Sequence, residues 1–204
     1  MNRRDMLFGA FRAALAPVAL QVKAKARERV DGKQGKELIG RPAPPLELEH
    51  WIHSQPLEMN RLKGKVVLLR WWTGGCPLCE ATAPALLKFQ RDYESRGLQV
   101  IGIYHPKPAG DWDMRKLDAA TAEKQFTFPV ALDADWSALK RWWLDRERDY
   151  TSVSFLVDRT GVIRYVHPGG EFHQGTQGSY ASHETCNRDF RDIEGEIQKL
   201  LGKS

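Results

Sequence analysis

Two cysteines separated by two residues, Cys76 and Cys79, are the residues of this sequence whose type and spacing most directly indicate chemistry. An apolar run precedes them and residues at helical spacing follow, so we expect them where a buried strand gives way to a helix. Amides at a helix N-terminus favour a thiolate and lower the pKa of a CxxC thiol from about 8.5 to roughly 3.5–7.5. We therefore predict that Cys76 is the nucleophile in disulfide exchange, and that Cys79 resolves the mixed disulfide. Pro77 suits the first position of the helix, where an amide hydrogen has no intrahelical partner.

Zinc binding is the main alternative for a CxxC pair, and it requires two further ligands. His183 and Cys186 form an HxxC that could complete four ligands with Cys76 and Cys79. No second CxxC and no HxxxH accompanies them. We therefore favour redox chemistry, and we expect neither a cofactor nor a resident metal.

Two histidines are candidates for an auxiliary role. His105 and His167 each directly follow a predicted strand. Either could exchange a proton with Cys79 or stabilise the Cys76 thiolate. The alternative for both is a solvated histidine in a turn at a strand end.

The third cysteine, Cys186, lies in register with Phe190, Ile193 and Ile197 of a predicted amphipathic helix. That register favours a small buried apolar side chain. A second redox partner for Cys76 is the alternative.

The elements that must position these residues follow an α/β order. Strands are expected where residues 66–69 form an apolar run that ends in Trp71-Trp72 and where residues 100–104 form a second one, a pattern typical of strands covered on both faces. Asp158 to Gly161 form a strong hairpin turn between the last two strands. The fold class expected is a central mixed β-sheet flanked by helices, preceded by an N-terminal β-hairpin within residues 46–65. Other strands are expected over 128–132, 153–157 and 162–166, with helices after Cys79, over 111–125, over 135–144 and at the C-terminus.

Charge is concentrated at the N-terminus. Residues 1–36 hold nine of the 31 Lys and Arg residues and three of the 26 Asp and Glu residues, which leaves 22 basic and 23 acidic residues beyond them. The body is therefore nearly neutral, and nucleic acid is not an expected partner. Arg3-Arg4 before a modestly apolar stretch predicts a twin-arginine export signal over 1–26, followed by a linker over 27–37 and one domain over 38–204.

An ordered set of short motifs extends from Gly40 to about Leu201. Through this set the chain resembles the TlpA-like, ResA-like branch of the thioredoxin superfamily, within the AhpC/TSA-redoxin clan. The resemblance implies a thioredoxin fold and a thiol-disulfide oxidoreductase that acts through its CxxC pair. The matching positions are Gly40, Ala43 and Pro44; Leu62, Gly64, Lys65 and Val67; Trp72, Cys76, Cys79 and Pro84; and residues 155–158 with Gly161.

Three positions depart from the pattern of that family. Gly75 stands where an aromatic residue usually precedes the first cysteine, and Thr82 where a glutamate is usual. Ser152 falls where the family has a cis-proline facing the CxxC pair, a residue that shapes the substrate groove. Ser152 is therefore a further candidate site residue.

The resemblance implies a periplasmic reductase that acts on protein disulfides and receives electrons from a membrane or periplasmic thiol protein. An N-terminus that stays uncleaved as a membrane anchor, and a cytoplasmic protein with a basic tail, are the alternatives for location. A peroxiredoxin-type peroxidase using Cys76 is an alternative function, because Thr73-x-x-Cys76 matches part of that active-site pattern. A metal chaperone using Cys76, Cys79 and one histidine is another.

Overall fold

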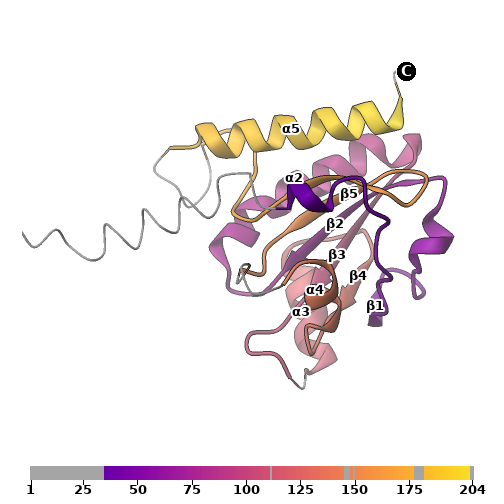
Figure 1. Cartoon of the computed structure of the whole chain (residues 1–204). Helices are drawn as coiled ribbons and strands as arrows, with labels where there is room; N and C mark the ends of the chain where they lie inside the picture. The colour runs from indigo at the N-terminus through magenta and orange to yellow at the C-terminus, as the bar shows by residue number, and fades with distance from the viewer. Residues whose placement is uncertain (1–34, 111, 145–147, 149, 177–181, 203–204) are drawn as a thin grey trace, which may run out of the picture. The chain divides into compact units, whose positions relative to one another are not determined.

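A computed structural model describes residues 35–110, 112–144, 148, 150–176 and 182–202. Within this part of the chain a mixed sheet of six strands has the order β1-β4-β3-β2-β5-β6, with helices packed against it (Figure 1), which confirms the expected α/β class. The strands are β1 (Glu49–Ile52), β2 (Val66–Trp72), β3 (Leu98–Tyr104), β4 (Val130–Leu132), β5 (Ser154–Val157) and β6 (Ile163–His167). The α-helices are α2 (Pro77–Tyr93), α3 (Met114–Glu123), α4 (Ser137–Trp142) and α5 (Glu184–Leu201), and the 3-10 helices are η1 (Lys36–Leu38), η2 (Met59–Leu62) and η3 (Glu94–Arg96).

The predicted export signal over 1–26 lies outside the described residues, as does most of the predicted linker over 27–37. The domain boundaries therefore stay predictions. Among the described residues, no helix is both long and apolar enough to cross a membrane.

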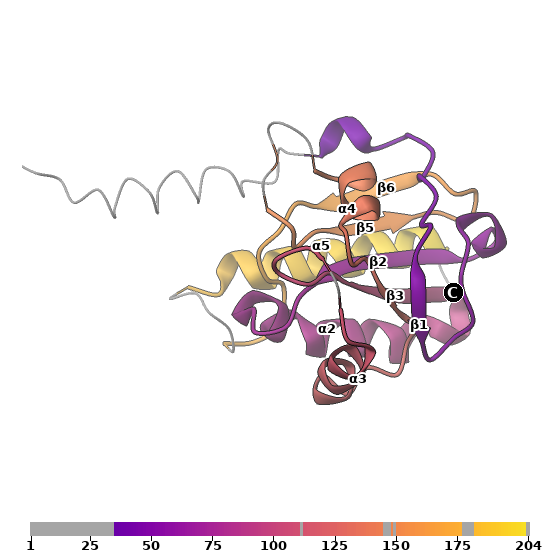
Figure 2. The ribbon, with the colours of Figure 1, turned by 90° about the horizontal axis from the view of Figure 1, so that it is seen from below.

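Strand β2 is the central strand, as its apolar sequence predicts. It pairs in parallel with β3 and antiparallel with β5, and all seven of its residues are buried. Figure 2 shows β6, β5, β2 and β3 following one another across the sheet. Because β2 ends at Trp72, the loop that follows it carries the cysteine pair to one edge of the sheet.

Alternate residues of β2 face two separate cores. Val66 and Leu68 pack in a cluster with α2 and α5, whereas Val67 and Leu69 pack with α4. Arg70 has the same parity as Val66 and Leu68, so its side chain points to the face that α2 and α5 cover.

The N-terminal segment differs from the expected hairpin. Strand β1 pairs antiparallel with β4, about 80 residues later in the chain, and Pro42 forms an isolated bridge with Val162 beside β6. The segment thus reaches from β6, one outermost strand of the sheet, to β1, the other. Pro56, which lies between β1 and η2, lacks the amide hydrogen that a returning hairpin strand would need, which is a physical reason for the difference.

The two final strands confirm the predicted hairpin. β5 and β6 pair antiparallel, and Gly161 closes the turn with a φ of 85°. Because β5 runs antiparallel to β2, β6 runs parallel to β2 and ends at the same edge as β2 and β3. The fold therefore brings the residues after β3 and β6 to the edge where the cysteine pair lies.

Candidate active site

Cys76 begins helix α2. It is the N-cap residue, Pro77 occupies the first turn as predicted, and the amides of Cys79 and Glu80 both donate to the Cys76 carbonyl at 3.0 Å. Gly75 has a φ of 66°, a left-handed conformation that bulky residues rarely adopt. A glycine in place of the usual aromatic residue thus suits the conformation of this turn. The Cys76 side chain that follows it is partly exposed.

Cys79 lies one helical turn further in and is 4% exposed. Its sulfur is 3.3 Å from the hydroxyl oxygen of Ser152. The predicted proximity of position 152 to the cysteine pair is therefore observed. The peptide bond before Ser152 is trans. Among the described residues, the cis peptide bond is the one between Lys107 and Pro108.

The two thiols are both free, and they share a hydrogen bond. That bond, the charge of Arg70 and hydrogen bonds from Ser152 and Thr73 together lower the pKa of Cys79 to about 5. The bond to Cys79 and partial burial raise the pKa of Cys76 instead. The groups that stabilise an anion thus act mainly on Cys79, whereas the sequence analysis expected the lowered pKa at Cys76.

Arg70 is the functional candidate that the sequence analysis missed. Its guanidinium is fully buried, and Nη1 donates to Ser154 Oγ at 3.2 Å and Nη2 to the Gly170 carbonyl at 2.9 Å. It lies 5.5 Å from the centre of the Phe172 ring. No carboxylate among the described residues forms an ion pair with it, so the thiolate of the cysteine pair is the anion available to this buried cation. A positive charge within an otherwise apolar strand was the signal in the sequence.

His105 lies directly after β3 and is 0% exposed. Its ring packs edge-on against Trp136, and neither ring nitrogen has a hydrogen-bond partner. Burial, together with the charges of Lys107 and Arg70, lowers the pKa of His105 to about 3. The ring is therefore neutral at physiological pH and supplies no positive charge to a thiolate. The alternative of a solvated turn residue is wrong, because the ring is buried.

His167 ends β6 and is also buried. Its Nε2 atom lies 3.3 Å from Asp189 Oδ2, and its ring packs edge-on against Phe172. Burial lowers the pKa of His167. The ring therefore contacts α5 and the segment after β6, and its role in proton exchange stays a prediction.

Cys186 is 1% exposed at the start of α5, as expected for a small buried side chain. Its sulfur lies 3.7 Å from Glu171 Oε1, and burial and that carboxylate raise its pKa to about 11. Whether it also exchanges disulfides with Cys76 stays a prediction.

The metal-ligand sets proposed from the sequence are not the set that the structure assembles. In the described part of the chain, the group of side chains close enough to hold one ion consists of Glu171, His173, His183 and Cys186, hereafter the Glu171 cluster. Cys76 and Cys79 are not in it. His183 and Cys186 thus come together as predicted, but with two residues of the segment after β6 rather than with the CxxC pair.

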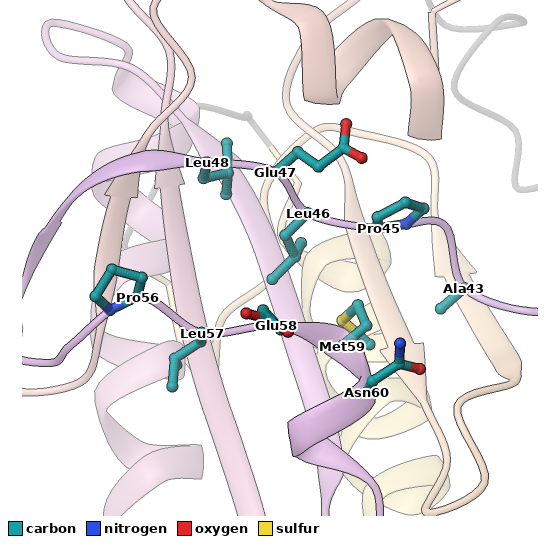
Figure 3. A pocket seen from close by; sticks show the side chains of 10 residues that line it. All are labelled: Ala43, Pro45, Leu46, Glu47, Leu48, Pro56, Leu57, Glu58, Met59 and Asn60. Atoms are coloured by element: carbon teal, nitrogen blue, oxygen red, sulfur yellow. The ribbon is translucent and has the colours of Figure 1, made fainter.

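A pocket of ≈ 500 Å³ lies elsewhere, between the N-terminal segment and η2 (Figure 3). No cysteine or histidine lines it, and its polar side chains are Glu47, Glu58 and Asn60. Glu47 also forms an ion pair with Arg141 at 2.6 Å. The pocket therefore carries none of the candidate site residues.

The fold and the cysteine pair at the start of α2 define the thioredoxin-like class of protein. Residues 39–166 match the AhpC/TSA family, and the chain belongs to that family.

Similar proteins agree with this assignment. The chain is 28% identical over 162 residues to the protein DipZ of Mycobacterium tuberculosis, covering 78% of this chain but only 22% of that protein. It is 26% identical over 133 residues to the thiol-disulfide oxidoreductase YkuV of Bacillus subtilis, covering 65% of this chain and 86% of that protein. The fold resembles the crystal structure of a thiol-disulfide isomerase from Corynebacterium glutamicum, with a TM-score of 0.62 at 24% identity over 80% of this chain and 97% of that one.

Proposed function

We propose that this protein exchanges disulfides with protein substrates through Cys76 and Cys79, in the reducing direction and outside the cytoplasm. The observation that carries the proposal is the asymmetry of the pair. Cys76 is partly exposed at a helix N-terminus, whereas Cys79 is buried against Ser152 Oγ at 3.3 Å and near the cation of Arg70. A protein disulfide can therefore reach the sulfur of Cys76, whereas the surroundings of Cys79 favour its thiolate form.

The chemistry follows from this asymmetry. As Cys76 attacks a substrate disulfide, its proton passes to Cys79 along the shared hydrogen bond. The substrate S–S bond breaks, a mixed disulfide forms with Cys76, and one substrate thiolate leaves. Cys79 then gives its proton to that thiolate or to solvent and attacks the Cys76 sulfur, which expels the second substrate thiolate. The substrate thus gains two electrons. The protein loses two electrons, because it now holds a Cys76–Cys79 disulfide.

Arg70 supports the second half of this cycle. A buried cation favours the ionised form of a nearby acid, so Cys79 can lose its proton without a carboxylate base. The same stabilisation of the thiolate favours the reduced protein, which makes the pair a milder reductant than it would be without Arg70.

The place of action and the electron donor rest on the sequence. The paired arginines at positions 3 and 4, before a modestly apolar stretch, support export. An exported pair has no access to a cytoplasmic reductant, so we propose a membrane or periplasmic thiol protein as its donor. Expression with the native N-terminus, followed by fractionation of periplasm, membrane and cytoplasm, tests this part; recovery of the protein solely from the cytoplasm would contradict it.

Trapping of substrates tests the exchange itself. In Cys79→Ser, Cys76 can attack but the mixed disulfide cannot be resolved, so we expect covalent adducts with disulfide-containing proteins that dithiothreitol releases. Cys76→Ser should form none, and Cys186→Ser should turn over like the wild type. Peroxide consumption by the wild type without any transfer to protein disulfides would instead support the peroxidase alternative.

A further inference from the structure

The Glu171 cluster is built by two short patterns that the fold brings together. Glu171 and His173 lie two residues apart in the segment between β6 and α5, a spacing that places side chains on one side of an extended chain. His183 caps α5 and Cys186 lies in its first turn, three residues later, so both are on one face of the helix. The amide of His173 donates to the carbonyl of Cys186 at 3.4 Å, which fixes the two patterns against each other.

The side chains of the cluster are withdrawn from solvent. Glu171 is 2% exposed, His173 4% and Cys186 1%. Both ring nitrogens of His173 and Nδ1 of His183 are buried without a hydrogen-bond partner. Buried polar atoms are normally satisfied, so the unsatisfied nitrogens of these two neighbouring rings call for a ligand that accepts one lone pair from each ring. The two rings are 5.2 Å apart between centroids and pack edge-on.

The donor atoms have nearly the spacing that a tetrahedral ion requires. All four lie within 4.8 Å of one another. Glu171 Oε1 is 3.7 Å from the Cys186 sulfur and 3.7 Å from His173 Nε2. Bonds of about 2.0 Å to nitrogen or oxygen and about 2.3 Å to sulfur place tetrahedral ligands about 3.3–3.6 Å apart. Small side-chain rotations would therefore bring the donors to ligating distance.

The chemistry of the donors selects the ion. One thiolate, two imidazoles and one carboxylate are a mixed set that suits zinc, whereas magnesium and calcium favour oxygen ligands alone. A thiolate and a carboxylate together balance the charge of a divalent cation, so the occupied site would bury no net charge. His183, which is only partly buried, also lines a surface hollow of ≈ 610 Å³, so this ligand of the four lies nearest to solvent.

We propose that Glu171, His173, His183 and Cys186 bind one zinc ion in a closed, structural site. Four protein ligands leave no open position for water or substrate, which distinguishes such a site from a catalytic one. This inference replaces the expectation of no resident metal. It is independent of the proposed exchange reaction, because the cysteine pair supplies no ligand.

The ion would hold in place a segment that contacts the candidate active site. The Gly170 carbonyl accepts from Arg70, and the amide of Phe172 donates to Thr82 Oγ1 of α2 at 3.4 Å. Asn187 on α5 already clamps the same segment, because its side chain exchanges two hydrogen bonds with Gly175, at 2.8 and 2.9 Å. Zinc would add a second connection between this segment and α5, next to the hydrogen bonds of Asn187 with Gly175.

Metal binding by the full chain tests the proposal without any readout of exchange activity. We would titrate zinc into metal-free protein in competition with a chromophoric chelator, using the wild type and a Cys76→Ser/Cys79→Ser double variant. We expect one zinc per chain in both. Cys186→Ser and His183→Gln should each lower the affinity by at least about 100-fold. His50→Gln, which removes an exposed histidine outside the cluster, is the matched control and should bind as the wild type does.

Cobalt(II) gives a second readout that depends on the sulfur ligand. The wild type and the double variant should develop a thiolate-to-cobalt charge-transfer band, and Cys186→Ser should not. Absence of the band and of zinc binding in the wild type would overturn the proposal. Loss of binding in the double variant, or wild-type affinity in both Cys186→Ser and His183→Gln, would overturn it as well. Because His183 is partly exposed, His183→Gln should stay folded even if a variant of a buried ligand does not, and circular dichroism of the metal-free proteins would confirm that.

Discussion

Replacing Arg70 by methionine tests how the buried cation sets the redox chemistry of the pair. Methionine keeps much of the length of the side chain and removes the charge, and exchanging a buried charged group for an apolar one is often tolerated. We expect the reduction potential of the Cys76–Cys79 disulfide to become more negative. The reason is that the reduced protein loses stabilisation of the Cys79 thiolate, whereas the oxidised protein has no anion at that position.

The size of the change follows from the pKa of Cys79, which is about 5 with Arg70 present. A cation in direct proximity typically lowers the pKa of an acid by about 1 to 3, so the variant should have a Cys79 pKa of about 6 to 8. At pH 7 the reduced form then loses about 1.3–2.7 kcal/mol, and 1.4 kcal/mol corresponds to about 30 mV for a two-electron couple. The potential should therefore fall by about 30–60 mV.

The assay is equilibration in dithiothreitol or glutathione redox buffers, followed by alkylation and mass analysis of the trapped thiols. Ultraviolet titration of the thiolate in the same proteins reports the pKa directly. Arg91→Met is the matched control, because Arg91 is on α2 with a side chain that is 72% exposed, and its potential should equal that of the wild type. An unchanged or more positive potential in Arg70→Met, with an unchanged thiolate pKa, would refute the reasoning.

Three further predictions concern the surroundings of the pair. The pKa of Cys79 is lowered from its ordinary value of 9.0 to about 5, so its contribution to the stability of the reduced protein is complete above pH 9 and is lost as the pH falls through 5. Denaturant unfolding should show the reduced form gaining about 2–3 kcal/mol over the oxidised form between pH 5 and pH 7, and a gap independent of pH would contradict this. Ser152→Ala removes the contact at 3.3 Å from the Cys79 sulfur; since a hydrogen bond to a charged group contributes about 1.5 kcal/mol, the thiolate pKa should rise by about one, and an unchanged ultraviolet titration would count against that contact. Gly169→Ala places a methyl group 2.8 Å from the Tyr150 ring at a φ of 133°, so we expect destabilisation by about 2–4 kcal/mol in thermal unfolding. Gly161→Ala, which has a positive φ but no neighbouring atom within 4 Å, should lose clearly less.

Local patterns predicted much of the fold because they report burial directly. The apolar run of β2 indicated a strand covered on both faces, and the spacing of Phe190, Ile193 and Ile197 indicated the buried face of α5. The pairing of β1 with β4 was not predictable in the same way, since it joins residues about 80 positions apart and leaves no local period in the sequence.

The candidate site was predicted only in part, where local patterns in the sequence indicate it. The position of the pair at the start of α2 and the contact of Ser152 with Cys79 agree with the sequence analysis. The stabilisation of Cys79 rather than Cys76 was missed, because the interpretation of β2 as an apolar strand passed over Arg70 in its middle. Only the parity of the strand and the position of α2 above it show that this charge lies beneath the thiols.

The Glu171 cluster illustrates a second limit of local patterns. Each of its halves, Glu-x-His and His-x-x-Cys, is short and common in proteins of many kinds. Their meeting depends on the path of the chain between β6 and α5, which returns the segment to the first turn of the helix. Ligand distances therefore required the folded structure.

The equilibrium between the dithiol and the disulfide of Cys76 and Cys79 tests the central claim most directly. Mass-resolved thiol trapping of the wild type and of Cys186→Ser in graded redox buffers gives both the connectivity and the potential. We predict a reversible two-electron transition between Cys76 and Cys79 whose potential is the same in both proteins. If Cys76 and Cys79 form no reversible disulfide with each other, the account of this protein as a thiol-disulfide oxidoreductase is contradicted.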